Sequence, residues 1–121
     1  MKIEKKIVQT ILENDLSLRN FVNDGEYLQY KIEDKELLEE IETFLGGIIE
    51  HDSENIKDRR ECIETTIVYF EKHNCYIKEV AVGECHYKDV MIDGEYNSLE
   101  YYLVEPKEVK VVNYFDVEKL N

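Results

Sequence analysis

The sequence predicts an α+β fold, with helices in the first half packed on one face of a C-terminal antiparallel meander. Two observations predict it: apolar residues recur at helical spacing through most of the first 73 residues, and they alternate with a period of two from Cys75 onward. The 121 residues, 43% of them hydrophobic, suffice for one core. Because no linker, repeat or low-complexity tract interrupts the chain, we expect a single domain over residues 1–121.

The N-terminal third predicts two helices and one strand. An apolar stripe runs through residues 2–13 and stops at Asn14, which predicts the first helix. A second, shorter helix is expected over residues 16–23, closing at Asn-Asp-Gly. The heptapeptide EYLQYKI then alternates apolar and polar residues, which predicts a strand over residues 26–32.

The most regular amphipathic pattern predicts a helix over residues 35–50. Asp34 precedes it as a suitable N-cap. The pattern places seven apolar residues in one arc of the helix, namely Leu37, Leu38, Ile41, Phe44, Leu45, Ile48 and Ile49. Gly46 and Gly47 fall inside this pattern, so any break or kink of the helix is expected at these two residues.

A further helix is predicted over residues 54–73. Ser53 is a suitable N-cap, and Asn74 suits the left-handed position that closes a helix. The predicted buried line is Ile56, Ile63, Ile67 and Phe70.

The C-terminal half predicts an antiparallel meander. Gly83-Glu84 is interpreted as a two-residue turn that pairs Val82 with Cys85, and Asp93-Gly94 is the strongest hairpin signal in the chain. A four-residue turn, Glu-Pro-Lys-Glu, follows Val104. These turns give three to four strands, at residues 75–82, 85–92, 96–104 and 109–115.

The neighbouring Cys85 and His86 are the first candidates for chemistry. Neighbouring residues of a strand point to opposite faces, so they cannot form a thiolate–imidazole pair. A zinc site built from His73, Cys75, Cys85 and His86 is also disfavoured, because the predicted register separates the two cysteines along the ladder. With three cysteines and no secretion signal, we expect reduced thiols, Cys62 being a small core residue.

No other motif identifies a reaction. The chain has no Gly-rich phosphate loop, nucleophile elbow, zinc-protease helix or EF-hand pattern. We therefore expect no enzyme, no catalytic residues, no metal ligands and no cofactor. A divalent-metal-dependent enzyme stays open as an alternative, because 28 acidic residues could include a metal-binding cluster.

Net charge narrows the class of partner. The formal charge of −13 disfavours direct binding to nucleic acid or to an anionic membrane, and it favours a basic protein. No apolar run approaches the length of a membrane span, and the N-terminus lacks the apolar core of a signal peptide. We expect a cytoplasmic protein, and the bias toward Ile and Lys suggests a bacterial or phage source.

The acidity concentrates in residues 33–64, which carry twelve acidic and four basic residues. The candidate binding residues are the carboxylates of this region, on the predicted helix and just after it: Glu36, Glu39, Glu40, Glu42, Glu50, Asp58 and Glu61. Tyrosines are the second group, since tyrosine beside carboxylates favours protein surfaces and arginine side chains. The candidates in the predicted meander are Tyr96, Tyr101 and Tyr102.

These observations predict a small non-enzymatic binding protein that neutralises a basic, nucleic-acid-handling protein. The carboxylate-rich helix face would act as a DNA mimic by replacing phosphate charge. A phage counter-defence inhibitor, such as an anti-CRISPR protein, or an immunity protein for a nuclease toxin would fit. The alternative is a homo-oligomeric interaction module, a homodimer for example, that uses an exposed sheet edge and whose acidity serves only solubility.

Overall fold

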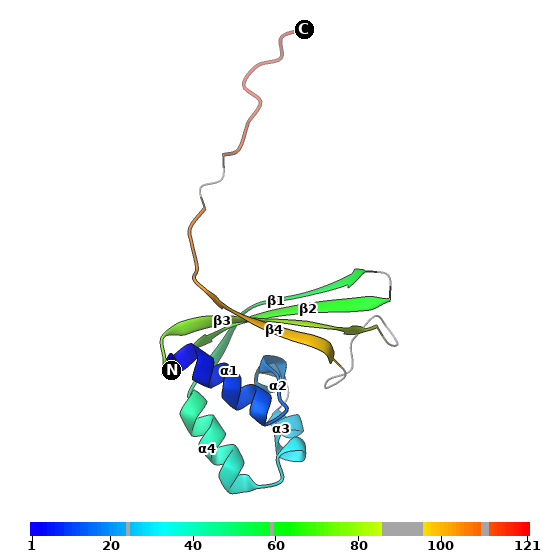
Figure 1. Cartoon of the computed structure of the whole chain (residues 1–121). Helices are drawn as coiled ribbons and strands as arrows, with labels where there is room; N and C mark the ends of the chain where they lie inside the picture. The colour runs from blue at the N-terminus through cyan, green and yellow to red at the C-terminus, as the bar shows by residue number, and fades with distance from the viewer. Residues whose placement is uncertain (24, 59, 86–95, 110–111) are drawn as a thin grey trace.

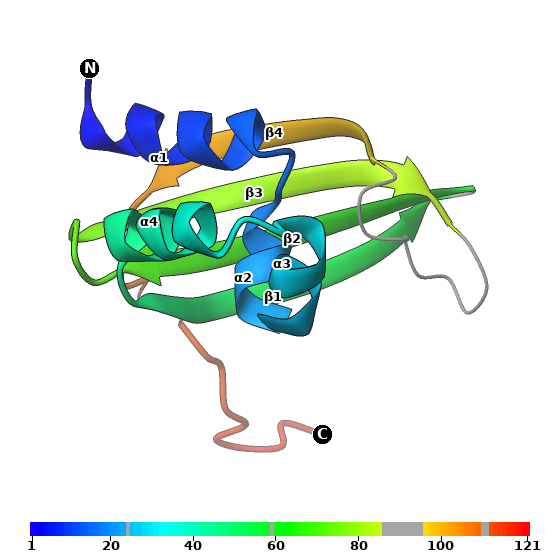
Figure 2. The ribbon, with the colours of Figure 1, turned by 90° about the horizontal axis from the view of Figure 1, so that it is seen from below.

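The computed structural model describes residues 1–23, 25–58, 60–85, 96–109 and 112–121. Within these residues four helices precede a four-stranded antiparallel sheet of order β1-β2-β3-β4. All four helices lie on one side of the sheet (Figures 1 and 2), so the predicted α+β class is confirmed. The elements are α1 (Ile3–Glu13), α2 (Leu18–Asn23), α3 (Gly25–Lys31), α4 (Lys35–Leu45), β1 (Ile48–Asp58), β2 (Glu61–Phe70), β3 (Cys75–Glu84) and β4 (Tyr96–Val104).

Helices α1 and α4 begin where their patterns predicted. Asp34 caps α4, because its carboxylate accepts hydrogen bonds from the N–H groups of Glu36 at 3.1 Å and Leu37 at 3.2 Å. The predicted helix of residues 35–50 is too long, since α4 ends at Leu45. Gly46 adopts a φ of +71°, a conformation that ends the helix and that glycine adopts readily. A side chain at this position would also collide with Lys72, which lies in the turn between β2 and β3.

The strand predicted over residues 26–32 is wrong, because this segment forms α3. Leu28 and Ile32 are buried and four residues apart, so they lie on one helical face. Tyr30, expected on the same strand face, is 82% exposed. The alternation of Leu28, Tyr30 and Ile32 was therefore ambiguous, because its first and last members are also spaced as neighbours on one face of a helix.

The helix predicted over residues 54–73 is also wrong, because the chain forms a hairpin of β1 and β2 there. Burial in β2 follows a period of two, with Cys62 and Val68 inward and Ile63 and Ile67 outward. The β-branched run that contains these isoleucines favours a strand over a helix. Asn74 does adopt the predicted left-handed conformation, with φ 49°, but it closes the turn between β2 and β3.

The meander is confirmed for two of its four predicted strands, residues 75–82 and 96–104. The predicted turn at Gly83-Glu84 is wrong, because both residues continue β3 and pair with β2. Val82 lies opposite Ile63 and Ser98 rather than Cys85. The rest of the predicted strand 85–92, with His86 and the Asp93-Gly94 turn, lies outside the described residues.

The last predicted strand, residues 109–115, is wrong for the part that the structure describes. Val109 and residues 112–115 belong to no strand, and their side chains are exposed. The C-terminal segment instead runs away from the sheet on the side opposite the helices (Figure 1).

The core fills the layer between the helices and the sheet. Its fully buried members come from α1, α2 and α4 and from β2 and β3, and include Ile7, Ile11, Leu18, Leu45, Val68, Phe70 and Ile77. Burial of these side chains is the main stabilising term of the fold. Among the described helices, none is long and apolar enough to cross a membrane.

Candidate protein-binding surfaces

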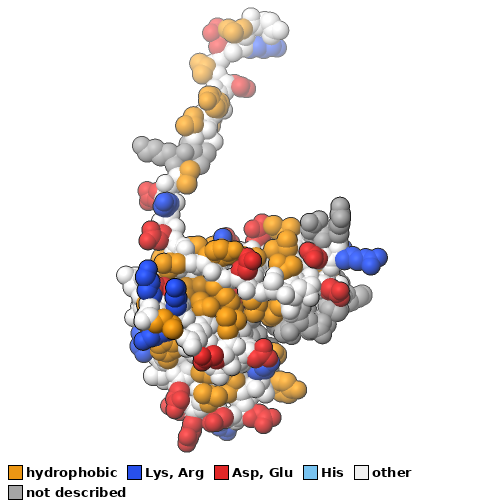
Figure 3. Space-filling model, in the orientation of Figure 1, with side chains coloured by type: hydrophobic (Ala, Val, Ile, Leu, Met, Phe, Trp, Pro, Cys, Tyr) orange, Lys and Arg blue, Asp and Glu red, His pale blue; other side chains and the backbone are white. Residues whose placement is uncertain are grey.

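Four of the predicted carboxylates stay together on α4. Glu36, Glu39, Glu40 and Glu42 are exposed, and none forms an ion pair within the part of the chain that the structure describes. The first three line a shallow depression of about 480 Å³ together with Thr43 and Phe44. Acidic side chains gather at this helical end of the molecule, at the bottom of Figure 3.

The other predicted carboxylates lie apart from α4. Glu50 is exposed on β1, because the chain leaves the helix at Gly46 and re-enters as a strand. Glu61 begins β2, and Asp58 ends β1 with a side chain outside the described set. The predicted carboxylates therefore do not form one face. The prediction placed Glu50 on the same helix as Glu36, whereas Glu50 lies in β1.

The three candidate tyrosines point in different directions. Tyr102 is 45% exposed, donates a hydrogen bond to Glu100 at 2.5 Å, and lies with the Lys78 ammonium 4.8 Å from its ring centroid. Tyr101 faces the helices, where burial and then the Glu79 carboxylate raise the pKa of its hydroxyl. Tyr96 is half-buried beside Ser17, so Tyr102 is the candidate that presents an open ring.

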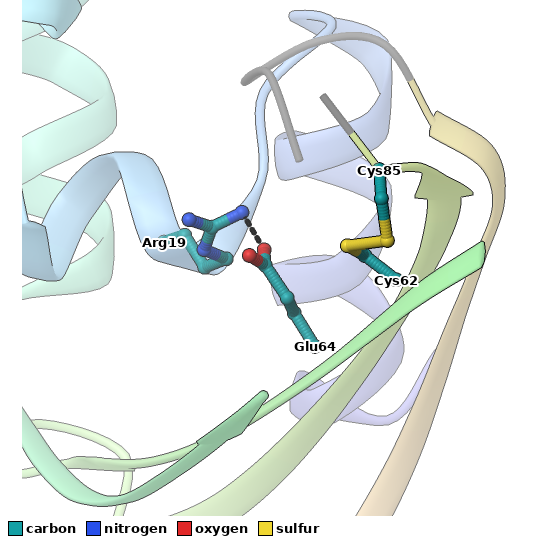
Figure 4. Close-up of a disulfide and its surroundings, with 4 residues drawn as sticks. All are labelled: Arg19, Cys62, Glu64 and Cys85. Carbon is teal, nitrogen blue, oxygen red and sulfur yellow. Dashed lines mark ion pairs between the residues drawn. A yellow bond between two sulfur atoms is a disulfide. The ribbon is translucent and has the colours of Figure 1, made fainter. Parts of the chain in front are cut away.

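A buried polar cluster lies under the helices, and sequence reasoning missed it. Glu79 is fully buried, and its carboxylate accepts a hydrogen bond of 2.6 Å from the N–H of Leu18, the first residue of α2. Burial raises the pKa of Glu79, and the Leu18 hydrogen bond opposes that shift. Next to it, Arg19 forms a largely buried ion pair with Glu64 (Figure 4).

This cluster ties α2 to the sheet. A six-residue helix has donors at its N-terminus without helical partners, and here a carboxylate of β3 supplies one acceptor. The alternation Cys75, Ile77, Glu79, Ala81 was the available signal, because it places Glu79 inward with apolar neighbours.

The prediction of reduced thiols is wrong for two of the three cysteines. Cys62 and Cys85 form a disulfide, with Cα atoms 5.2 Å apart (Figure 4). The longer β3 explains the error, because Gly83 pairs with Cys62 and carries Cys85 to the end of β2. Cys75 is free, and burial raises the pKa of its thiol. Within the described ranges no three His, Cys, Asp or Glu side chains could hold a metal ion.

The sheet face turned away from the helices is an apolar surface that no described element covers. Its centre consists of outward residues of all four strands, and we call this set the outer face: Ile56, Ile63, Ile67, Tyr69, Tyr76, Val80, Val82 and Tyr102. Side chains directly opposite on neighbouring strands share a face, so these residues form one continuous surface.

Aromatic rings occupy one end of the outer face. The Tyr69 and Tyr76 rings have centroids 4.6 Å apart, and the His51 ring packs edge-on against Tyr76 at 5.0 Å. Carboxylates surround the apolar centre, since Asp52, Glu54, Glu61, Glu84 and Glu100 occupy outward positions of the same strands. An apolar and aromatic centre with a charged rim is the usual composition of a protein-binding surface.

Comparisons with known proteins add no assignment. No protein-family model, curated protein or solved structure matches the chain.

Proposed function

We propose that the protein is a non-enzymatic binding module whose outer face contacts a protein partner. The observation that carries the proposal is the uncovered apolar sheet face. Ile56 is 47% exposed and Tyr102 45% exposed there, in a chain that buries charged groups under its helices. Contiguous apolar surface of this kind is uncommon on a monomer without a partner.

The chemistry of the rim favours a basic partner. Five carboxylates surround the outer face, while Lys78 is the one cation among its described outward residues and lies over the Tyr102 ring. Together with the net charge of −13, this rim would attract a basic protein by electrostatic steering and repel nucleic acid.

A second candidate is inhibition of a nucleic-acid-handling protein by a phosphate-like surface, as in an anti-CRISPR protein or a nuclease-toxin immunity protein. It is supported by the depression that Glu36, Glu39 and Glu40 share on α4. The two candidates require different faces of the molecule, so variants separate them. No observation in the described part of the chain favours a metal-dependent enzyme.

The cytoplasmic location expected from the sequence remains a prediction. The Cys62–Cys85 disulfide favours an oxidising environment, because cytosolic thiols are usually kept reduced. The redox state of these cysteines in protein isolated under thiol-blocking conditions would decide between the two environments.

The test is affinity capture at low salt, followed by binding measurements with the captured partner. We expect Ile49→Asp/Ile56→Asp, which changes two residues at least 42% exposed, to weaken binding by about tenfold or more. Glu36→Lys/Glu39→Lys/Glu40→Lys should mainly slow association and reduce its salt dependence. The control Glu71→Lys/Glu105→Lys/Glu108→Lys makes the same change in charge at positions that belong to neither surface.

The results for the two variants show which surface binds the partner. If the α4 variant abolishes binding while the outer-face variant binds normally, the second candidate replaces the first. If both bind like the control, neither surface is the binding site and both candidates fail.

A further inference from the structure

An apolar groove lies between α1 and β4. Its volume is about 610 Å³, and its apolar lining includes Val8 and Leu12 of α1 with Tyr101 and Leu103 of β4. Leu12 is 48% exposed and Leu103 57% exposed, so the groove is open to solvent. Hydrophobic side chains gather over this part of the molecule in Figure 3, where α1 and β4 lie in Figure 1.

One wall of the groove is a sheet edge. Strand β4 is the last strand in the order β1-β2-β3-β4, and within the described residues its backbone pairs only with β3. An edge strand offers unpaired N–H and C=O groups to another extended segment. An edge beside an apolar groove is the arrangement by which folded domains add a peptide strand, with the groove receiving alternate side chains.

The chain itself carries a segment suited to this position. After β4, the described residues of the C-terminal segment expose large apolar side chains at 74% or more, namely Val109, Val112, Tyr114, Phe115, Val117 and Leu120. In an extended conformation Val112 and Tyr114 point to one side, and Phe115 and Val117 point to the other. Either side would therefore bring two large apolar side chains into the groove.

The geometry favours the groove of another copy over the chain's own. Pro106, the second residue after β4, cannot donate to a ladder, and the segment continues away from the sheet instead of turning back (Figure 1). The charged lining of the groove is balanced, with Lys2 and Lys5 against Glu4 and Glu13, so charge does not exclude a segment that carries Asp116 and Glu118.

We propose that residues 112–118 of one copy add to the β4 edge of a second copy and fill its α1–β4 groove, reciprocally, to form a homodimer. The exchange buries apolar residues that a single chain leaves in water. It is also self-complementary, as a two-fold symmetric dimer requires. The groove shares only Tyr102 with the outer face, and the test below changes no residue of that face, so this proposal stands or falls separately from the function proposed above.

The test measures molecular mass against concentration for the full chain, by sedimentation or light scattering. We expect the mass of one chain at low micromolar concentration and twice that mass at high micromolar concentration. The segment variant Tyr114→Asp/Phe115→Asp and the groove variant Leu12→Asp/Leu103→Asp should each raise the dimer dissociation constant by about tenfold or more. Lys119→Asn/Asn121→Asp makes the same change in charge just beyond residues 112–118 without removing an apolar side chain, and should dimerise normally.

Mixing the two defective variants gives the sharper result. The segment variant keeps an intact groove and the groove variant keeps an intact segment, so the mixture should form a heterodimer through one exchanged segment although neither variant pairs with itself. Circular dichroism and thermal unfolding verify that each variant is folded, and Leu103→Lys replaces the double groove variant if that variant fails to fold. A full chain that stays monomeric, variants that still dimerise, or folded variants that fail to form the heterodimer would each overturn the proposal.

Discussion

The two faces of the sheet both depart from the usual pattern of apolar side chains inside and polar side chains outside. The face under the helices buries Glu64, Thr66 and Glu79, each at most 6% exposed. The uncovered outer face presents isoleucines, valines and tyrosines from the same strands. The covered face can hold carboxylates because α2 brings a backbone donor and a guanidinium to them. The outer face has no such explanation inside the chain, and this difference is why we place the partner there.

The strongest test of the covered face is the buried ion pair. Arg19→Met leaves Glu64 as a buried charge without its guanidinium, and we expect a loss of about 3 to 5 kcal/mol in the free energy of unfolding. The double variant Arg19→Met/Glu64→Leu should recover most of that loss, because two apolar side chains need no compensation. Urea denaturation of the four proteins of this cycle measures both effects. A single-variant loss below about 1 kcal/mol would mean that water already solvates Glu64.

The disulfide should contribute the next largest effect. Cys62 and Cys85 are 23 positions apart and enclose nearly all of β2 and β3, so their cross-link restricts the unfolded chain. Cys62→Ser/Cys85→Ser is expected to lower the free energy of unfolding by roughly 2 to 4 kcal/mol. Reductant should lower the Tm of the native chain and leave that of the variant unchanged. Equal sensitivity of both proteins to reductant would show that the cross-link does not form in solution.

The N-terminal helices and the C-terminal sheet differ in how well the sequence predicts them. Asp34 and the apolar stripe of α4 predict a helix because cap and periodicity agree locally. Residues 54–73 contain isoleucines at spacings that fit both a helix and a strand, and the choice was decided by pairing with β3, which is a tertiary effect.

The site was less predictable than the fold for the same reason. Whether Tyr101 or Tyr102 faces the solvent depends on the register of β4 against β3, and the predicted turn at Gly83-Glu84 instead paired residues 75–82 with residues 85–92. The disulfide was hidden by the same error, because Cys85 reaches Cys62 only if β3 continues past Gly83. The exposed α4 carboxylates, which need only helical periodicity, were placed correctly.

A pH titration examines Glu79 on the covered face. Burial raises the pKa of this carboxyl in the folded chain, so its contribution to stability is complete below the ordinary carboxyl pKa and is lost as the pH rises through the raised value. Relative to Glu79→Gln, which does not titrate, the native chain should therefore lose stability as the pH rises above about 4.3, the ordinary pKa of a glutamate. The other carboxyl groups are common to both proteins and cancel in the difference. If the native chain gained stability over the variant in this range, the hydrogen bond from Leu18 would outweigh the cost of burial.

The smallest expected effect compares the two faces most directly, at one valine on each. Val68 is fully buried on the covered face, and Val80 is half-buried on the outer face of the neighbouring strand. Threonine has nearly the same shape and a similar strand preference, so each change to Thr mainly reports the cost of placing a hydroxyl in that environment. We expect Val68→Thr to lower the free energy of unfolding by about 1 to 3 kcal/mol and Val80→Thr by less than about 0.5 kcal/mol.

With the partner bound, the comparison should change at Val80 alone. A partner that covers the outer face would desolvate the new hydroxyl, so Val80→Thr should weaken binding although it hardly affects the isolated chain. Val68→Thr changes a residue buried on the covered face, so this variant should bind like the native chain under conditions in which it is folded. Equal costs for the two variants in the isolated chain would mean that the outer face is already covered without a partner, and the contrast between the faces would then no longer locate a binding site.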